Sequence, residues 1–275
     1  MPPEPVPSAG EPVDGDRSEG PGPQGEAAPV GSRPVPAPVA GRRYSVRRRV
    51  RLGDVSARGR LRLDATARYL QDVANDDASS ADIEDAAGWV VRRTAIDVHR
   101  TCGFRDDLEL TTWCSGLGAR WAERRTVIVS SGGELVADAV AIWVHVDPST
   151  SRPRRLGPRF EAVYGPSAAG RTVRARLEHP EPPGDVREVP WTLRVTDLDL
   201  MGHMNNAVYW EALEGELSRR RDLRAPLRAS VEHRAGAEAG QDLTVVAADD
   251  DAGARVWFVA DGAVAASCVV GPLPG

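Results

Sequence analysis

The stretch "TDLDLMGHMNNAVYWEALE", Thr196 to Glu214, decides the fold because an earlier stretch of the chain repeats it. Without a gap, "GDVSARGRLRLDATARYLQ", Gly53 to Gln71, aligns with it residue by residue. An internal repeat of this kind predicts two copies of one structural unit. The matched pairs are Asp54 and Asp197, Gly59 and Gly202, Leu70 and Leu213, and Gln71 and Glu214.

The same order of elements is expected around each copy of the repeat. Apolar residues at three- and four-residue spacing predict helices over 64–75 and 206–219. A strand is predicted before each helix, over 44–52 and 191–195. Four more strands are predicted after each helix: 90–98, 108–114, 124–129 and 135–146 in the first copy, and 229–234, 243–247, 255–259 and 264–270 in the second. The sequence therefore predicts an α+β fold built twice.

The two copies differ in their polar residues. Ser56 stands opposite Asp199, and Arg60 stands opposite His203. The second copy thus carries a carboxylate and an imidazole just before its helix, and the first copy has neither at those positions. This difference predicts that the C-terminal copy holds the chemistry.

Several stretches of the chain match one family pattern: "DLDLMGHMNNAVYWEALE" in the second half, and "YLQDVANDDA", "GWVVRRTAIDVHR", "LELTTWCSG" and "AIWVHVDPSTSRPRRL" in the first. On these residues the chain resembles the acyl-acyl carrier protein thioesterases of the plant and bacterial type. The resemblance implies a tandem hotdog fold, with two antiparallel sheets each wrapped around a central helix. It also implies hydrolysis of fatty acyl thioesters on acyl carrier protein, to free fatty acid and holo carrier protein, with no metal or organic cofactor.

Composition and this resemblance together predict four segments. Residues 1–41 are rich in proline, glycine and acids and are expected to be disordered. Residues 42–150 are expected to form an N-terminal, substrate-binding hotdog that has lost its catalytic groups. Residues 151–188 are expected to be a linker, and residues 189–275 the catalytic hotdog.

The resemblance also implies catalytic positions. Plant members have an Asp, an Asn two residues on, a His two further on, and a Glu from a later strand. In this chain the first and third positions are Asp199 and His203, whereas Met201 stands at the Asn position and the Glu position falls near Gly236. Asp199 would activate water or attack the acyl carbon directly. His203 would hydrogen-bond the base or water, or protonate the leaving thiolate.

Several residues near this pair are expected to support it. Asn205 is predicted to be the third catalytic residue, which orients ligand or water. Asn206 is a possible supporting residue with the same task. Either asparagine is equally expected to be the N-cap of the helix. Gly202 would permit a close backbone approach at the start of the helix, where free N–H groups suit an oxyanion. Glu214 is either a second carboxylate of the site or the partner of a nearby arginine.

The acyl chain and the carrier protein suggest further residues. Trp89 and Trp143 are candidates to line the acyl tunnel. Three arginine-rich stretches, "RRYSVRRRVR", "SRPRR" and "SRRRDLR", suit an acidic carrier protein with its phosphopantetheine arm, or are simply solvated surface. Both an acyl-CoA thioesterase and a non-catalytic acyl-binding hotdog protein remain as alternatives.

Bulk composition excludes several other classes of protein. The 275-residue chain carries a formal net charge of −5, so it lacks the basic excess expected of a nucleic-acid-binding protein. No apolar run approaches the roughly 20 residues that cross a bilayer, and the N-terminus has no basic-then-apolar signal pattern. The three cysteines have neither disulfide nor metal-ligand spacing, which predicts a cytoplasmic protein without a metal. A monomer and a homodimer are equally compatible with a tandem chain.

Overall fold

The computed structural model describes residues 36–83, 88–250 and 253–274. Most of the predicted disordered tail, residues 1–35, lies outside these ranges. In the N-terminal half the strands are β1 (Tyr44–Arg49), β2 (Trp89–Val98), β3 (Asp107–Leu117), β4 (Trp121–Ser130) and β5 (Leu135–His145). In the C-terminal half they are β6 (Arg187–Val189), β7 (Leu227–His233), β8 (Leu243–Asp250), β9 (Gly253–Ala260) and β10 (Ala263–Pro272). The helices are α1 (Leu63–Ser80), α2 (Pro158–Ala168) and α3 (Tyr209–Arg219).

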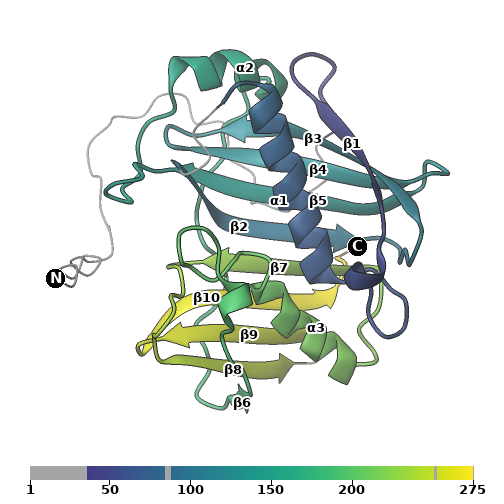
Figure 1. Ribbon diagram of the computed structural model, residues 1–275, viewed down its shortest axis with the longest axis vertical. Helices are drawn as coiled ribbons and strands as arrows, with labels where there is room; N and C mark the ends of the chain where they lie inside the picture. Colours follow the sequence, from purple (N-terminus) through teal and green to yellow (C-terminus); the bar gives the residue numbers. More distant parts are fainter. Residues whose placement is uncertain (1–35, 84–87, 251–252, 275) are drawn as a thin grey trace.

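All ten strands form a single sheet in the order β1-β3-β4-β5-β2-β7-β10-β9-β8-β6, and every neighbouring pair is antiparallel. The halves meet where β2 pairs with β7, from Arg93 opposite Glu232 to Val98 opposite Leu227. The two predicted sheets are therefore joined edge to edge into one. Figure 1 shows α1 crossing the N-terminal half of this sheet and α3 crossing the C-terminal half on the same face.

The central helices form where the repeat predicts them because each has one apolar face. On α1, Leu63, Ala67, Leu70 and Val73 are buried at three- and four-residue spacing, as expected of a helix packed on a sheet. On α3, Leu213 and Leu217 serve the same purpose. The two helices also contact each other, so the main hydrophobic core runs through both halves.

The segment predicted to be a strand over 191–195 does not pair with the sheet. Trp191 packs edge-on against Phe258, with ring centroids 5.3 Å apart, and Leu193 packs on the same core. The alternation of apolar residues thus reflects burial against the face of the sheet rather than pairing at its edge. β6, a few residues earlier, takes that edge by pairing with β8.

The predicted linker contains a helix that the sequence does not suggest. α2 has Gly165 and Pro166 in its interior, and both residues normally interrupt helices. It starts favourably, with Pro158 in its first turn. Its apolar side packs on β3, where Tyr164 is only 1% exposed.

A buried carboxylate connects α1, α2 and β4. Asp77, on α1, accepts hydrogen bonds from Arg42 Nε at 2.6 Å, Arg124 at 2.6 Å and the Tyr164 hydroxyl at 3.0 Å. Its side chain is 1% exposed, and that of Arg124 is 13% exposed. Burial lowers the pKa of Arg124, but Asp77 and Tyr164 outweigh burial and the net shift is upward. The cation therefore stays charged inside the N-terminal half.

Within the described ranges, none of the helices combines the length and the apolar character needed to cross a membrane.

Candidate active site

Asp199 organises the loop that leads into α3. Its Oδ1 accepts hydrogen bonds from the backbone N–H groups of Met201 at 2.8 Å and His203 at 3.1 Å, and its own N–H donates to the His203 carbonyl at 2.7 Å. The turn needs a positive φ of 79° at Gly202, which glycine adopts without strain. Among the described residues, Asp199 Oδ2 has no hydrogen-bond or ion-pair partner. One oxygen fixes the turn, and the other is available for a ligand or water.

His203 has a carboxylate partner that sequence reasoning missed. Its Nε2 lies 3.3 Å from Glu238 Oε1, because residues 203 and 238 form a short antiparallel bridge. The His203 ring lies over Gly236, where a Cβ would come within 3.1 Å of it. A glutamate at position 236 would crowd the imidazole, whereas Glu238, two residues on, reaches it. The bridge between the two segments, which no local pattern reveals, makes this pair.

Asn205 forms the turn before α3. Its Oδ1 accepts the Ala207 N–H at 2.9 Å, and its carbonyl accepts the Val208 N–H at 2.9 Å. Residues 206–208 therefore form a turn, and the helix begins at Tyr209 rather than at the predicted residue 206. The N-cap position of α3 is Val208, which makes no side-chain capping hydrogen bond, so the expectation that Asn205 or Asn206 is the N-cap is wrong.

Asn206 is the residue of this loop that faces a cavity. A cavity of about 250 Å³ and an adjoining one of about 30 Å³ both have Asn206 in their walls. Within the described ranges, neither its backbone N–H nor its side chain makes a hydrogen bond. Free donors at the wall of a cavity suit an oxygen that gains negative charge.

Both predicted tunnel tryptophans line these cavities. Trp89 lies on the larger one, and Trp143 lies on both. The Trp143 indole N–H is buried and has no hydrogen-bond partner. The structure therefore brings both tryptophans together with Asn206, whereas Asp199 and His203 are absent from the walls of the two cavities.

Gln71, on α1, is a further polar residue that the sequence did not single out. It lines both cavities beside Asn206, and its carboxamide has no hydrogen-bond partner among the described residues. The repeat contains the signal that points to it, because Gln71 aligns with Glu214. At this aligned position α1 carries Gln71 and α3 carries Glu214.

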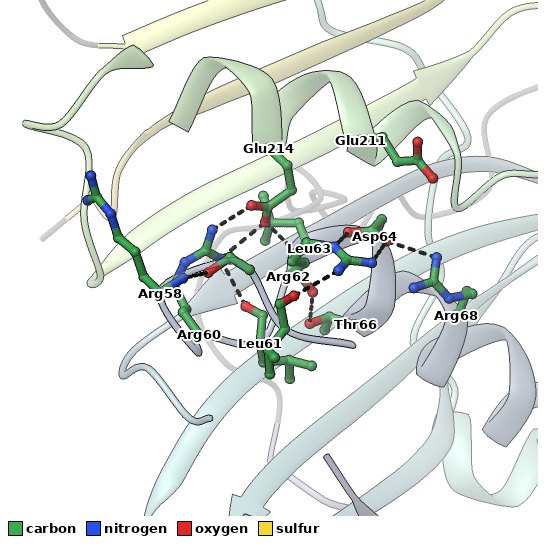
Figure 2. A network of polar contacts seen from close by, with 12 residues as sticks. Arg58, Arg60, Leu61, Arg62, Leu63, Asp64, Thr66, Arg68, Glu211 and Glu214 are labelled. Carbon is green, nitrogen blue, oxygen red and sulfur yellow. Dashed lines mark hydrogen bonds and ion pairs between the residues drawn. The ribbon is translucent and has the colours of Figure 1, made fainter. Parts of the chain in front are cut away.

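Glu214 takes the second of its two expected roles. It accepts hydrogen bonds from Arg60 at 3.1 and 2.5 Å and from the Leu63 N–H at 2.7 Å, as Figure 2 shows. Leu63 is the first residue of α1, so Glu214 supplies an acceptor to the unpaired N–H groups there. It caps the helix of the N-terminal half and lies outside the cavities of Asn206.

A neutral histidine completes the wall of the smaller cavity. His233, on β7, is 8% exposed, and its ring packs edge-on against Tyr209 with centroids 4.8 Å apart. Burial, followed by the charge of Arg92, lowers the pKa of His233 to about 3. Its imidazole is therefore uncharged at neutral pH.

The arginine-rich stretches are partly neutralised by acids. In the first, Arg48 lies 3.1 Å from Asp72, and Arg49 lies 2.7 Å from Asp107. In the third, Arg220 lies 2.7 Å from Asp222. Over the described part of the chain, no three His, Cys, Asp or Glu side chains gather as a metal site would require.

Comparison with known proteins places this geometry in a family. The model of the acyl-ACP thioesterase N-terminal domain matches residues 41–164, and that of the C-terminal domain matches residues 181–260. An uncharacterized protein of Mycobacterium tuberculosis is 30% identical, over 86% of this chain and 94% of its own length.

Solved structures share the fold. A putative oleoyl thioesterase from Lactobacillus plantarum has a TM-score of 0.70 at 20% identity, over 86% of this chain and 99% of that one. The 12:0-ACP thioesterase from Umbellularia californica has a TM-score of 0.67 at 17% identity, over 85% and 98%. At this identity the likeness concerns the fold.

Proposed function

This chain belongs to the acyl-ACP thioesterase family and is a thioester hydrolase, and from that premise we propose that it hydrolyses fatty acyl thioesters of acyl carrier protein to free fatty acid and holo carrier protein. The observation that carries the proposal is Asn206, which lines a cavity together with Trp89 and Trp143 and whose N–H and carboxamide make no hydrogen bond within the described ranges. A cavity with aromatic walls and hydrogen-bond donors fits an alkyl chain that ends at a carbonyl.

In this proposal the acyl chain occupies the N-terminal half. The cavity of about 250 Å³ lies between α1 and the sheet and is bounded by aromatic side chains of β2, β5 and α2, namely Trp89, Trp143, Phe160 and Tyr164. The thioester carbonyl then lies at Asn206, where the N–H and the carboxamide stabilise the oxyanion. The carboxamide of Gln71, which lines the same cavity, helps to hold the same oxygen.

The loop before α3 supplies the proton transfers. Asp199 Oδ2 takes a proton from water, and the resulting hydroxide adds to the thioester carbon. When the C–S bond breaks, protonated His203 gives its proton to the departing thiolate, and the proton held by Asp199 then passes to His203, so that both groups return to their starting state. Glu238 keeps the imidazole of His203 oriented, as the third group of a catalytic triad orients the base. Asn205 holds the loop against α3 and so acts by positioning.

We also propose the division of the chain and the setting of the reaction. Residues 42–150 and 189–275 are two hotdog units, of which the second is catalytic, and residues 151–188 connect them. All three cysteines are free, which agrees with a reducing cytoplasm. Val195 and Leu200, 85% and 107% exposed, flank Asp199 on its loop. Exposed apolar side chains beside a site favour a substrate carried by a protein.

Matched substrates test this proposal. We expect the purified protein to release thiol from acyl carrier protein thioesters with a kcat/KM at least tenfold above that for the CoA thioesters of the same acyl chains. A panel of chain lengths on both carriers gives this ratio directly. A higher kcat/KM for the CoA series would transfer the assignment to an acyl-CoA thioesterase, and tight acyl binding without turnover would favour a binding protein.

The Glu238→Gln variant tests the partner of His203. We expect kcat to fall by up to about fivefold, because this ion pair is exposed and such pairs contribute roughly 1 kcal/mol at most. KM should stay near the wild-type value, since Glu238 is remote from the acyl cavity. Glu188→Gln, which removes an exposed carboxylate on β6, is the control and should leave kcat unchanged. Equal kcat values for both variants would contradict the assigned role of Glu238.

A further inference from the structure

The proposed reaction leaves unused a cavity that is larger than the two beside Asn206. A cavity of about 560 Å³ lies between the start of α1, the ends of β2, β5 and β7, and the second half of α3. This volume is within the range of about 300–1,000 Å³ that is usual for small-molecule sites. Its walls are mainly aliphatic, and the buried ones among them include Leu61, Leu63, Ile128, Leu217 and Leu227.

The repeat relates this cavity to the proposed acyl cavity. On α3, Glu214, Leu217 and Ser218 line it. On α1, the aligned residues Gln71, Ala74 and Asn75 line the cavity of about 250 Å³. A residue at or just before the opposite helix also lines each cavity: Leu63, the first residue of α1, here, and Asn206, in the turn before α3, there. The two cavities are therefore related by the repeat: aligned residues of α1 line one of them, and aligned residues of α3 line the other.

The larger cavity lacks the groups for hydrolysis. Ser56 and Arg60 occupy the positions that correspond to Asp199 and His203. Glu214, its one carboxylate, is bound to Arg60 and to the Leu63 N–H, as Figure 2 shows. A ligand in this cavity would therefore bind without being cleaved.

Cations at the cavity wall select the charge of that ligand. Within the described ranges the Arg58 side chain has no hydrogen-bond or ion-pair partner, and in Figure 2 it extends away from the Arg60–Glu214 pair. Arg224 donates to the carbonyls of Arg220 and Leu223 and has no carboxylate within ion-pair distance in those ranges. Both are exposed, so each can turn its guanidinium to a carboxylate at the mouth of the cavity.

We propose that this cavity is a second, non-catalytic site that binds a long-chain fatty carboxylate, with its alkyl chain along the aliphatic walls and its head at Arg58 and Arg224. The choice of ligand rests on the proposed function, because a fatty carboxylate is the product of that reaction. The cavity, the repeat relation and the two arginines are independent of it. Since α3 lines this cavity and begins just after Asn206, a bound carboxylate contacts the same helix as the reacting centre.

Calorimetric titration with sodium dodecanoate, below the concentration at which it forms micelles, tests the proposal. We expect the wild-type chain to bind two molecules, one in each cavity. Ser218→Trp fills the mouth of the larger cavity and should leave one. Asn75→Trp, at the aligned position on α1, is the matched variant and should remove the other binding event only. A wild-type stoichiometry of one, unchanged by Ser218→Trp, would overturn the proposal.

The charge of the head group is tested separately. The Arg58→Ala/Arg224→Ala variant changes exposed residues only, and we expect it to weaken dodecanoate binding about tenfold at the site that Ser218→Trp removes. Dodecan-1-ol, which has the same chain without the charge, should bind this site more weakly than dodecanoate by a similar factor. Equal binding of the two ligands there would overturn the assigned role of the arginines. Circular dichroism confirms that each variant is folded.

Activity and binding together distinguish an error in the second site from an error in the proposed function. If the wild-type protein hydrolyses acyl carrier protein thioesters but binds one dodecanoate, only the second site is wrong. If it binds two molecules, with one lost in Ser218→Trp, and hydrolyses none of the thioesters, the site stands and the proposed reaction does not.

Discussion

Asp199→Asn is expected to lower kcat on acyl carrier protein thioesters by on the order of 10²-fold or more, the usual contribution of a general base. The substitution is nearly isosteric, and an asparagine Oδ1 can still accept the Met201 and His203 N–H groups that shape the loop. What it removes is the basicity of Oδ2, the oxygen without a partner among the described residues. KM should change little, because the acyl cavity is untouched. Single-turnover and steady-state kinetics measure both constants.

A neighbouring aspartate provides the control. Asp197 is 3% exposed, and its carboxylate binds Arg194, whose Nε lies 2.9 Å away. Its repeat counterpart Asp54 accepts the backbone N–H of Arg51 in the same way that Asp197 accepts the N–H of Arg194. Asp197→Asn should therefore lower thermal stability and leave kcat largely intact. Equal losses of kcat in the two variants, or a wild-type rate for Asp199→Asn, would remove Asp199 from the mechanism.

Asp77→Asn is expected to destabilise the protein by about 3–5 kcal/mol, the usual result of removing one partner of a buried ion pair. Arg124, 13% exposed, would lose the carboxylate that keeps it charged in the wall of the acyl cavity. Asparagine keeps only one acceptor oxygen, so Arg42, which uses Oδ1, and Tyr164, which shares Oδ2 with Arg124, cannot both keep their side-chain acceptor. Chemical denaturation, followed by circular dichroism, measures this loss through the midpoint and the free energy of unfolding.

Asp76→Asn is the matched control on the preceding residue. The Asp76 side chain is 41% exposed and lies 3.8 Å from Arg48, so its loss should cost roughly 1 kcal/mol at most. Asp77→Leu combined with Arg124→Met should recover part of the stability lost in Asp77→Asn, because no buried charge then lacks a partner. A similar free energy of unfolding for Asp76→Asn and Asp77→Asn would contradict this account.

Much of the fold followed from the sequence because the repeat and the apolar alternation are local patterns. The eight strands predicted after the two helices all form, as β2–β5 and β7–β10, and so does the strand predicted from residue 44. Features that depend on distant contacts did not follow. α2 was not predicted because Pro166 and its neighbouring glycine normally interrupt helices. The segment of Trp191 was predicted to be a strand because its apolar side chains are buried against the core. The edge-to-edge joining of the halves depends on the pairing of β2 with β7, which leaves no local pattern.

The candidate site divides in the same way. Comparison of the repeats drew attention to Asp199 and His203 because their counterparts lack the same chemistry. It could not reveal Glu238, which reaches His203 through a bridge between two segments of the fold. The start of α3 was placed three residues early, because Asn205 uses its side chain to form a turn before the helix.

The antiparallel contact of β2 with β7 joins two related halves of one polypeptide. In an assembly of two identical subunits, every substitution would alter both clefts at once, so neither could acquire a new ligand without the other. In this chain a single substitution changes the residues of one cleft and leaves the other cleft as it was. Two halves of one chain can therefore diverge, so that one half can serve hydrolysis while the other takes a separate task.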